Sequence, residues 1–338
     1  MSDPHSAAPP LSCRSPSYRS SFARYLLALW LLLAAQSLFA SCPVVDTVRA
    51  LPAPAQGELL VASQNLWNLM APGPQGRNRP TPEGLSARLD ALAAYVLDVL
   101  SAPHILAVQE VESLALLEAL AERISASGGP QYQAWLLSGH DPSGIDVGML
   151  ARAPVSGVTV RQVFQGERNL GHWLFHRPPL HVTVEAPFAL ELLIVHNRSG
   201  HGLDDARRSR QVKARRLAQA KALRGWALAR ISEGVPLMLI GDFNTAPDAG
   251  DYGEPFEYLN RPPLHSHWSA VPQPDRFTYI HRCQRQAIDH AFLSPRLQAR
   301  LQRAAVTRGN AGRFRTLHDQ GGTQVVSDHD GIGVYLKR

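Results

Sequence analysis

The sequence has 338 residues, a formal net charge of +6 at pH 7, 45% hydrophobic residues and 18% charged residues. This length allows one large domain or two small ones, and the composition is that of an ordinary globular protein with a sizeable core. It excludes a largely disordered chain, and the mild positive charge tolerates a polyanionic partner without requiring one.

Residues 1–42 have the pattern of an export signal. Three arginines precede an apolar run over residues 25–35, which continues weakly to residue 40 and ends in small residues. The run is shorter than the about 20 apolar residues of a stable membrane span. Residues 38–42 resemble a bacterial lipoprotein cleavage site, so three alternatives stay open: lipidation of Cys42, ordinary cleavage and release, or an uncleaved signal anchor. Each predicts export, to the periplasm, to the outer membrane as a lipoprotein, or to the medium.

The cysteines decide little about the compartment. Cys42 and Cys283 could form a disulfide in an oxidising environment, whereas lipidation of Cys42 would leave Cys283 as a lone thiol. No Cys/His spacing predicts a zinc site.

Beyond a Pro/Ala-rich linker over residues 43–57, apolar runs of strand length alternate with helical patterns. The predicted strands are 58–63, 104–108, 132–137, 147–151, 181–185, 190–195, 236–240, 287–293 and 331–336. The predicted helices are 85–100, 113–125 and a long one that opens at Asp204-Asp205, as acidic capping favours, and reaches about Ile231. Residues 248–276, rich in proline and aromatic residues, are expected to form a long surface excursion. No linker divides residues 58–338, so we expect one layered α/β domain.

Polar residues stand at the ends of these strands, where a rigid scaffold can aim side chains into a shared cleft. They are Asn65, Glu110, Asp146, His196, Asp242, Asn244, Asp328 and His329, and Asp289 lies inside such an apolar run. Carboxylates and a carboxamide are hard oxygen ligands suited to Mg²⁺ or Mn²⁺, and histidines exchange protons near neutral pH. Together they predict metal-assisted phosphoester hydrolysis. Taken singly, each also has a structural explanation, as a solvated carboxylate, a turn cap or a loop stabilised by side-chain hydrogen bonds.

The order of these residues resembles the endonuclease/exonuclease/phosphatase superfamily, and in particular its deoxyribonuclease-like exported bacterial branch, over about residues 58–336. The matching motifs are Gln64-Asn65, Gln109-Glu110-Val111, Asp146-Val147-Gly148, His196-Asn197-Arg198-Ser199, Gly241-Asp242-Phe243-Asn244, Ile288-Asp289-His290 and Ser327-Asp328-His329. The Gly-Asp-Phe-Asn motif is moderately specific, and the ordered set is far more so. The resemblance implies a four-layer α/β sandwich, with two mixed β-sheets packed face to face and helices outside.

The resemblance also implies a role for each residue of a metal and water site. Glu110 is the implied principal metal ligand, with Asn65 and Asp328 close to the same ion. Asp242 would orient or deprotonate the attacking water, and Asn244 would hold a phosphate oxygen.

A second group of residues is implied to contact phosphate. His329 would interact with the scissile phosphate, with Asp289 fixing its tautomer and favouring imidazolium. His196 matches the second histidine of the deoxyribonuclease-like branch, and Arg177 stands where that branch carries a phosphate-binding arginine, although a surface arginine before a Pro-Pro turn explains it equally. Two departures stand out: an Asn-Arg pair follows His196 where leucine and lysine are common, and the active-site tyrosine of several branches has no secure counterpart.

The substrate class stays open between alternatives, because one such centre serves several substrates. The basic balance, His196 with Arg177, and export favour a nuclease acting on DNA or RNA. The basic helix 204–231 could follow a phosphate backbone or simply present a solvated face. The second reading is a phosphodiesterase or phosphatase for lipid headgroups or small phosphate esters, with the aromatic residues of 248–276 touching a membrane or packing on the sheet. The third is a non-catalytic surface lipoprotein. We expect no obligate protein partner, and membrane contact only through the signal or a lipid anchor.

Overall fold

The computed structural model describes residues 47–73, 79–247, 250–312 and 326–338. The chain divides into two units, residues 1–42 and 43–338, and all described residues belong to the second. The predicted export signal therefore lies outside the described residues. Among the helices that are described, none is both long and apolar enough to cross a membrane.

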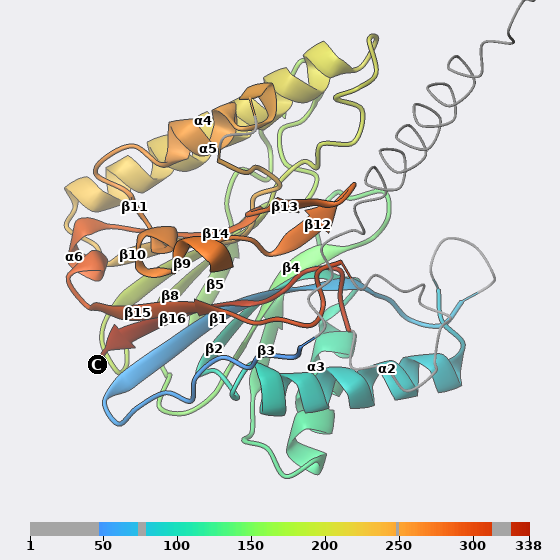
Figure 1. The fold of residues 1–338 in the computed structure, drawn as a ribbon, viewed down its shortest axis with the longest axis vertical. Coiled ribbons are helices and arrows are strands. Elements are labelled where there is room, and N and C mark those ends of the chain that lie inside the picture. Colours follow the sequence, from blue (N-terminus) through green and yellow to red (C-terminus); the bar gives the residue numbers. More distant parts are fainter. Residues whose placement is uncertain (1–46, 74–78, 248–249, 313–325) are drawn as a thin grey trace, which may run out of the picture. The chain divides into compact units, whose positions relative to one another are not determined.

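Two mixed sheets of six strands each form the centre of the fold (Figure 1). The first sheet, in spatial order, consists of β15 (Leu301–Val306), β16 (Ile332–Lys337), β1 (Glu58–Leu69), β2 (Ile105–Val111), β4 (Asp146–Ala151) and β3 (Gln133–Leu136). The second consists of β11 (His265–Ser266), β14 (Asp289–Leu293), β10 (Leu237–Asp242), β9 (Leu190–His196), β8 (Leu180–Val184) and β5 (Thr159–Gln162). Two short hairpins are β6 (Arg168–Asn169) with β7 (His172–Trp173), and β12 (Tyr279–His281) with β13 (Gln284–Gln286).

Each six-stranded sheet contains one parallel pair among otherwise antiparallel neighbours. β1 is parallel to β2, and the chain between them forms helix α2 (Pro82–Ala94) and its π-helical continuation η1 (Tyr95–Val99). β9 is parallel to β10, and the connecting segment contains helix α4 (Ser209–Ser232). Parallel strands need such crossovers, and both strands of a pair then end at the same edge of the sheet. The four strands that carry Asn65, Glu110, His196 and Asp242 are these two pairs.

Helices cover the outer faces of both sheets (Figure 1). α2 and α3 (Leu114–Ala126) cover the first sheet, and α4 with α5 (Glu254–Leu259) covers the second. The remaining helical segments are α6 (Pro295–Gln298) and the 3₁₀ turns η2 (Gly250–Tyr252), η3 (His267–Ala270) and η4 (Gln273–Asp275). This arrangement confirms the predicted four-layer α/β sandwich of two mixed sheets with helices outside.

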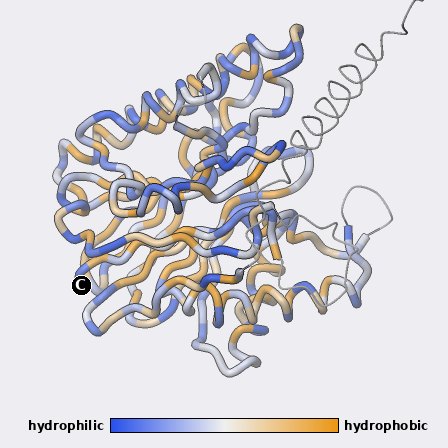
Figure 2. Tube along the Cα trace, in the orientation of Figure 1, coloured by the Kyte–Doolittle hydropathy of each residue, from blue (hydrophilic) through white to orange (hydrophobic). Residues whose placement is uncertain are grey.

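The core follows from the alternation of side chains along the strands. Leu59 and Val61 of β1 belong to the hydrophobic cluster that includes the second sheet and α4, whereas Leu60 and Ala62 belong to the cluster with α2 and α3. Successive side chains of a strand point to opposite faces, so β1 is buried on both sides. Figure 2 accordingly shows hydrophobic stretches along the strands between the helical layers.

Every predicted strand and helix is present, although several bounds differ. The long basic helix begins at Ser209 rather than at Asp204-Asp205. The reason is local: the Asp205 carboxylate accepts hydrogen bonds from the backbone N–H groups of Arg207 (2.8 Å) and Arg208 (3.2 Å), which caps a separate turn before the helix.

The expectation of a surface excursion over residues 248–276 is wrong for most of the segment. Phe256, Leu259, Leu264 and Trp268 are buried in the core cluster that contains the second sheet, and α5 packs beside α4. The aromatic residues therefore serve packing rather than a membrane-facing surface. Tyr252, which is 38% exposed, is the large aromatic residue of this segment that stays at the surface.

Part of the segment expected as a linker lies against the domain. Leu51 is buried in the cluster with α2 and α3, and its backbone N–H donates to the carbonyl of Val99 at 2.7 Å. Arg49 forms an isolated β-bridge with Arg308. The chain is thus ordered against the sheet before the first strand begins.

Candidate active site

The C-terminal ends of the two parallel pairs meet between the sheets. The Asn65 side-chain nitrogen Nδ2 donates to Glu110 Oε1 at 3.0 Å and to Asp242 Oδ2 at 3.2 Å, which joins β1, β2 and β10. His196 Nε2 lies 3.5 Å from Asp242 Oδ2 and 3.9 Å from Glu110 Oε1. Four residues predicted from separate motifs therefore form one centre.

Irregular backbone aims Glu110 into this centre. Glu110 has a φ of 64° and sits where the register of β2 shifts against β4, and the register of β1 also shifts after Asn65. Such bulges re-aim a side chain at the end of a strand. In the β1 bulge, Asn68 has a φ of 54° and its backbone N–H donates to Glu110 Oε2 at 2.9 Å. Both carboxylate oxygens of Glu110 are therefore held by residues of β1.

The close approach of β9 and β10 depends on Gly241. Its φ is 139°, and a Cβ at this position would lie 2.1 Å from the backbone oxygen of Val195. Only glycine fits there, so the glycine of the Gly-Asp-Phe-Asn motif keeps β10 close enough to β9 to bring Asp242 beside His196.

Asn65 lies beside Glu110, but it faces that carboxylate with its amide nitrogen. Its Oδ1 accepts a hydrogen bond from the backbone N–H of Trp67 at 2.8 Å, and a backbone N–H fixes which end of the amide is oxygen. In this structure Asn65 orients Glu110 and Asp242 rather than offering its oxygen to the centre.

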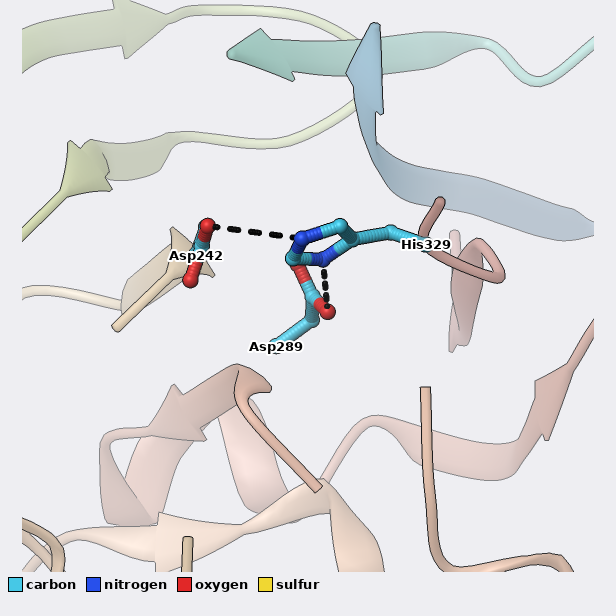
Figure 3. A group of neighbouring side chains, drawn as sticks. All are labelled: Asp242, Asp289 and His329. Carbon is cyan, nitrogen blue, oxygen red and sulfur yellow. Dashed lines mark hydrogen bonds and ion pairs between the residues drawn. The ribbon is translucent and has the colours of Figure 1, made fainter. Parts of the chain in front are cut away.

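His329 lies between two carboxylates (Figure 3). Its Nδ1 is hydrogen-bonded to Asp289 Oδ2 at 2.8 Å, and its Nε2 lies 3.9 Å from Asp242 Oδ2. Thr278 Oγ1 donates to the same oxygen of Asp289 at 2.5 Å, which fixes that carboxylate. The donor atoms of Asp242, Asp289 and His329 lie within 4.8 Å of one another.

A hydroxyl group connects the His329 loop to β1. Ser327 Oγ donates to the Asn65 carbonyl at 2.6 Å and accepts from the His329 backbone N–H at 3.0 Å. Asp328 Oδ1 lies 3.9 Å from His329 Nε2. The Ser-Asp-His motif therefore places Asp328 and His329 at the same centre as the strand-end residues.

The carboxylates of the centre are buried and repel one another. Burial, and then the neighbouring Asp328, raises the pKa of Glu110. Burial likewise raises the pKa of Asp328, and it raises the pKa of Asp242 to about 7. Each of these groups is costly to ionise in isolation, because an ion loses its hydration when it is buried.

The two histidines of the centre differ in charge. Burial alone would lower the pKa of His329, but the carboxylates of Asp289 and Asp328 outweigh it and raise that pKa well above its ordinary value. Burial, followed by Arg177 and His329, lowers the pKa of His196 well below its ordinary value. At neutral pH the site therefore holds one imidazolium and one neutral imidazole.

The charge balance fits a divalent cation. Four carboxylates (Glu110, Asp242, Asp289 and Asp328) meet here, and His329 lies within 4 Å of three of them. Arg88 and Arg216 act on them from farther away, and the charge of Arg177 is offset by its ion pair with Asp141. Arg88 Nη2 donates hydrogen bonds to the backbone carbonyls of residues 66, 67 and 326. The fully ionised centre therefore carries surplus negative charge on hard oxygen atoms, the donor set that Mg²⁺ or Mn²⁺ prefers.

Asn244 and Arg177 lie beside the centre with their polar groups engaged. Asn244, at a φ of 53°, donates its backbone N–H to Asp242 Oδ1 at 2.8 Å and its Nδ2 to the Asn197 carbonyl at 3.2 Å. Arg177 forms an ion pair with Asp141 and donates to the carbonyls of His196 and Asn197, at 3.3 Å each. Arg177 thus holds the loop after β9 in place.

Two residues of the centre have no signal in the sequence. Thr278 fixes Asp289, and the Tyr279 ring lies 4.9 Å from the His329 ring and lines a cavity of about 270 Å³ with Asp328. Burial raises the pKa of Tyr279 to about 12, so its hydroxyl stays protonated. Asp146 lies outside the centre, where its Oδ1 accepts from the Gly139 backbone N–H at 3.0 Å.

Comparisons with known proteins agree with this geometry. The model of the Endonuclease/Exonuclease/phosphatase family matches residues 62–329. No curated protein is significantly similar to the sequence.

Several solved structures share the fold at low identity. A truncated TDP2 from Caenorhabditis elegans is 19% identical, with a TM-score of 0.53 over 83% of this chain and 98% of that one. A 3′ phosphatase, NExo, from Neisseria, bound to a product DNA hairpin, is 16% identical, with a TM-score of 0.54 over 83% and 100% of the two chains. A family protein from Leptotrichia buccalis is 15% identical, with a TM-score of 0.54 over the same shares.

The family match spans most of the chain and every motif from Asn65 to His329. The fold, the meeting of these residues and the family match agree, and the activities in the family's name all hydrolyse phosphoester bonds. The chain therefore belongs to the Endonuclease/Exonuclease/phosphatase family.

Proposed function

We propose that the protein is an exported, Mg²⁺-dependent nuclease that hydrolyses phosphodiester bonds of DNA. The observation that carries this proposal is the buried centre of Glu110, Asp242 and His329, which adjoins a cavity lined by arginines. A carboxylate-rich centre suits a cation, and neighbouring arginines suit a polyanion. The NExo structure from Neisseria, described with a bound DNA product, supports DNA as the first substrate to test.

Glu110 and Asp328 are the residues proposed to hold Mg²⁺, for which Mn²⁺ would substitute. A bound divalent cation supplies positive charge that offsets the negative charge gathered in the transition state of phosphoester hydrolysis. Asp242, Asp289 and His329 also come close enough for a metal. However, His329 Nδ1 is already bonded to Asp289, and a protonated imidazole has no lone pair to offer a metal.

Different residues are proposed to activate the water and to bind the phosphate. Asp242 is proposed to orient and deprotonate the attacking water, because Asn65 and the Asn244 backbone N–H hold its two oxygens in place. His329, kept protonated by Asp289, donates from Nε2 to a phosphate oxygen. The Asn244 carboxamide is proposed to contact a second phosphate oxygen.

Digestion of supercoiled plasmid tests this proposal. The purified protein should nick the plasmid with Mg²⁺ and fail to do so with EDTA. Nicking should also weaken steeply with added salt, because binding to DNA releases counterions. Hydrolysis of sphingomyelin vesicles or a small phosphate ester, together with an intact plasmid, would instead favour a phosphodiesterase for lipid headgroups or small esters. A folded protein that is inactive on all these substrates would favour a non-catalytic surface protein.

Export is proposed from the pattern of residues 1–42 and supported by Cys283. Cys283 is disulfide-bonded. Disulfides persist mainly in oxidising compartments such as the periplasm or the medium. Mass spectrometry of protein recovered from cell fractions would show where the chain is cleaved and whether Cys42 carries a lipid. A full-length chain in the cytoplasmic fraction would contradict export.

A further inference from the structure

A second site adjoins the active centre on the side of β9. It is a cavity of about 320 Å³. Its polar lining residues are Asp141, His176, Arg177, His196, Arg198, Ser199, Arg215 and Gln219. His196 belongs to both sites, since it lines the cavity while its Nε2 reaches to 3.5 Å from Asp242. A ligand in the cavity is therefore separated from the catalytic carboxylates by one imidazole ring.

Two arginines of this cavity have no carboxylate partner among the residues that the structure describes. Arg198 donates to Ser199 Oγ at 2.8 Å and to the His201 carbonyl at 2.7 Å. Arg215 Nη1 lies 3.2 Å from His176 Nε2. Burial and the neighbouring Arg215 lower the pKa of His176, so that partner is neutral as well. In the described part of the chain neither arginine therefore has a carboxylate within 4 Å, because Asp141, which also acts on Arg198, is ion-paired with Arg177.

Buried and hydrogen-bonded side chains form part of the cavity wall. Arg215 is 9% exposed and lies on the inner face of α4, together with Gln219 at 2%. Gln219 Oε1 accepts from the Arg198 backbone N–H at 3.0 Å, and its Nε2 donates to the Leu174 carbonyl at 2.9 Å. Burying a guanidinium without an anion is costly, which points to an anion supplied from outside. The planar fork of arginine matches the oxygens of a phosphate.

We propose that Arg198 and Arg215 bind a second phosphate group of the nucleotide strand, next to the phosphate that is hydrolysed. The inference rests on the proposed nuclease function and adds a recognition site to it. It also assigns the substrate-facing role to the inner face of α4. The exposed arginines of the same helix, such as Arg210, take no part.

Binding of inorganic phosphate in EDTA tests the cavity without catalysis. In the absence of metal the active centre is rich in carboxylates and repels phosphate, so calorimetric binding reports the arginine cavity. Arg198→Gln should weaken this binding by about 10- to 100-fold, the scale of one hydrogen bond to a charged group. Arg210→Gln, which removes an exposed charge from the same helix, should bind like the native protein. Equal binding by native protein and Arg198→Gln would overturn the proposal.

Matched nucleotides test the same site during turnover. The substrates are the dinucleotide TpT and its forms with a second phosphate, pTpT, TpTp and TpTpT. In native protein at least one second phosphate should raise kcat/KM by about 10- to 100-fold. Arg198→Gln and the more conservative Arg215→Lys should shrink that ratio, whereas Arg210→Gln should keep it.

The outcomes separate this inference from the proposed function. Enhancement by pTpT or TpTp supports a site for a terminal phosphate, and enhancement by TpTpT supports one for an internal phosphodiester. Hydrolysis of all four substrates at equal rates overturns the second phosphate site and leaves the nuclease proposal standing. No hydrolysis of any of them, by a folded protein with Mg²⁺ that also leaves supercoiled plasmid intact, overturns both.

Discussion

Replacing Asp289 by asparagine should lower turnover while leaving the protein folded and able to bind substrate. Asp289 Oδ2 accepts from His329 Nδ1 at 2.8 Å and from Thr278 Oγ1 at 2.5 Å, and all three side chains are buried. The substitution keeps the shape but removes the charge that favours imidazolium. Hydrogen bonds to charged groups contribute about 1.5–3 kcal/mol and neutral ones about 1 kcal/mol, so the loss is about 0.5–2 kcal/mol. That difference corresponds to a fall in kcat of about 2- to 30-fold.

The assay is the hydrolysis of bis(p-nitrophenyl) phosphate with Mg²⁺, with kcat and KM measured separately. Thr278→Val removes the other hydrogen bond to the same carboxylate and keeps its charge, so it should lower kcat less than Asp289→Asn does. Asp90→Asn, in an exposed ion pair with Arg123, should change nothing. A kcat for Asp289→Asn within twofold of the native value, or an equal loss in Thr278→Val, would refute the reasoning.

Three further predictions concern stability and metal binding. Gly241→Ala should lower the free energy of unfolding, measured in urea, by roughly 3 kcal/mol, because the new Cβ meets the Val195 carbonyl. Gly225→Ala, with open space around the new Cβ, should not destabilise the protein. Equal free energies of unfolding for the two variants would contradict this prediction. Burial lowers the pKa of His290 from 6.5 to about 4. The contribution of neutral His290 to the free energy of unfolding is therefore complete above pH 6.5 and is lost as the pH falls to 4. Between pH 7 and pH 4 the free energy of unfolding should therefore fall by about 3 kcal/mol more for native protein than for His290→Gln. An equal fall in both proteins would contradict the lowered pKa of His290. Mg²⁺ should raise the Tm of native protein but not of Glu110→Gln, and an equal rise in both would exclude Glu110 as a ligand.

The sheets and the centre were predictable because two signals coincide in the sequence. The buried strands are short apolar runs in the sequence, and several functional residues stand at the ends of these runs. Asn65, Glu110, His196 and Asp242 illustrate this, since the crossover connections bring their four strand ends to one place.

The details of the centre depend on contacts between distant segments. The amide of Asn65 faces Glu110 with its nitrogen because the backbone N–H of Trp67 occupies its oxygen. Tyr279 reaches His329 from a short hairpin that has no periodic pattern. Neither feature leaves a trace in residue order.

In the basic helix α4 and in residues 248–276, the sequence did not predict which side chains are buried. In α4, Arg215 and Gln219 lie on the buried face together with Leu223, so polar and apolar residues share the side that packs inward. A run of basic residues does not reveal which of them are inside. In residues 248–276 the buried aromatic residues belong to helices and turns of six residues or fewer, too short for a periodic signal.

The most direct test of the central claim is the initial rate of bis(p-nitrophenyl) phosphate hydrolysis by native protein and by His329→Ala, each with Mg²⁺ and with EDTA. The predicted result is turnover that needs the metal and falls by about 100-fold or more in the variant, the scale of losing one charged donor to a transition state. Circular dichroism should show both proteins folded. Turnover that persists in EDTA, or that survives in His329→Ala at the native rate, would contradict the assignment of this centre as a metal-dependent phosphoesterase site.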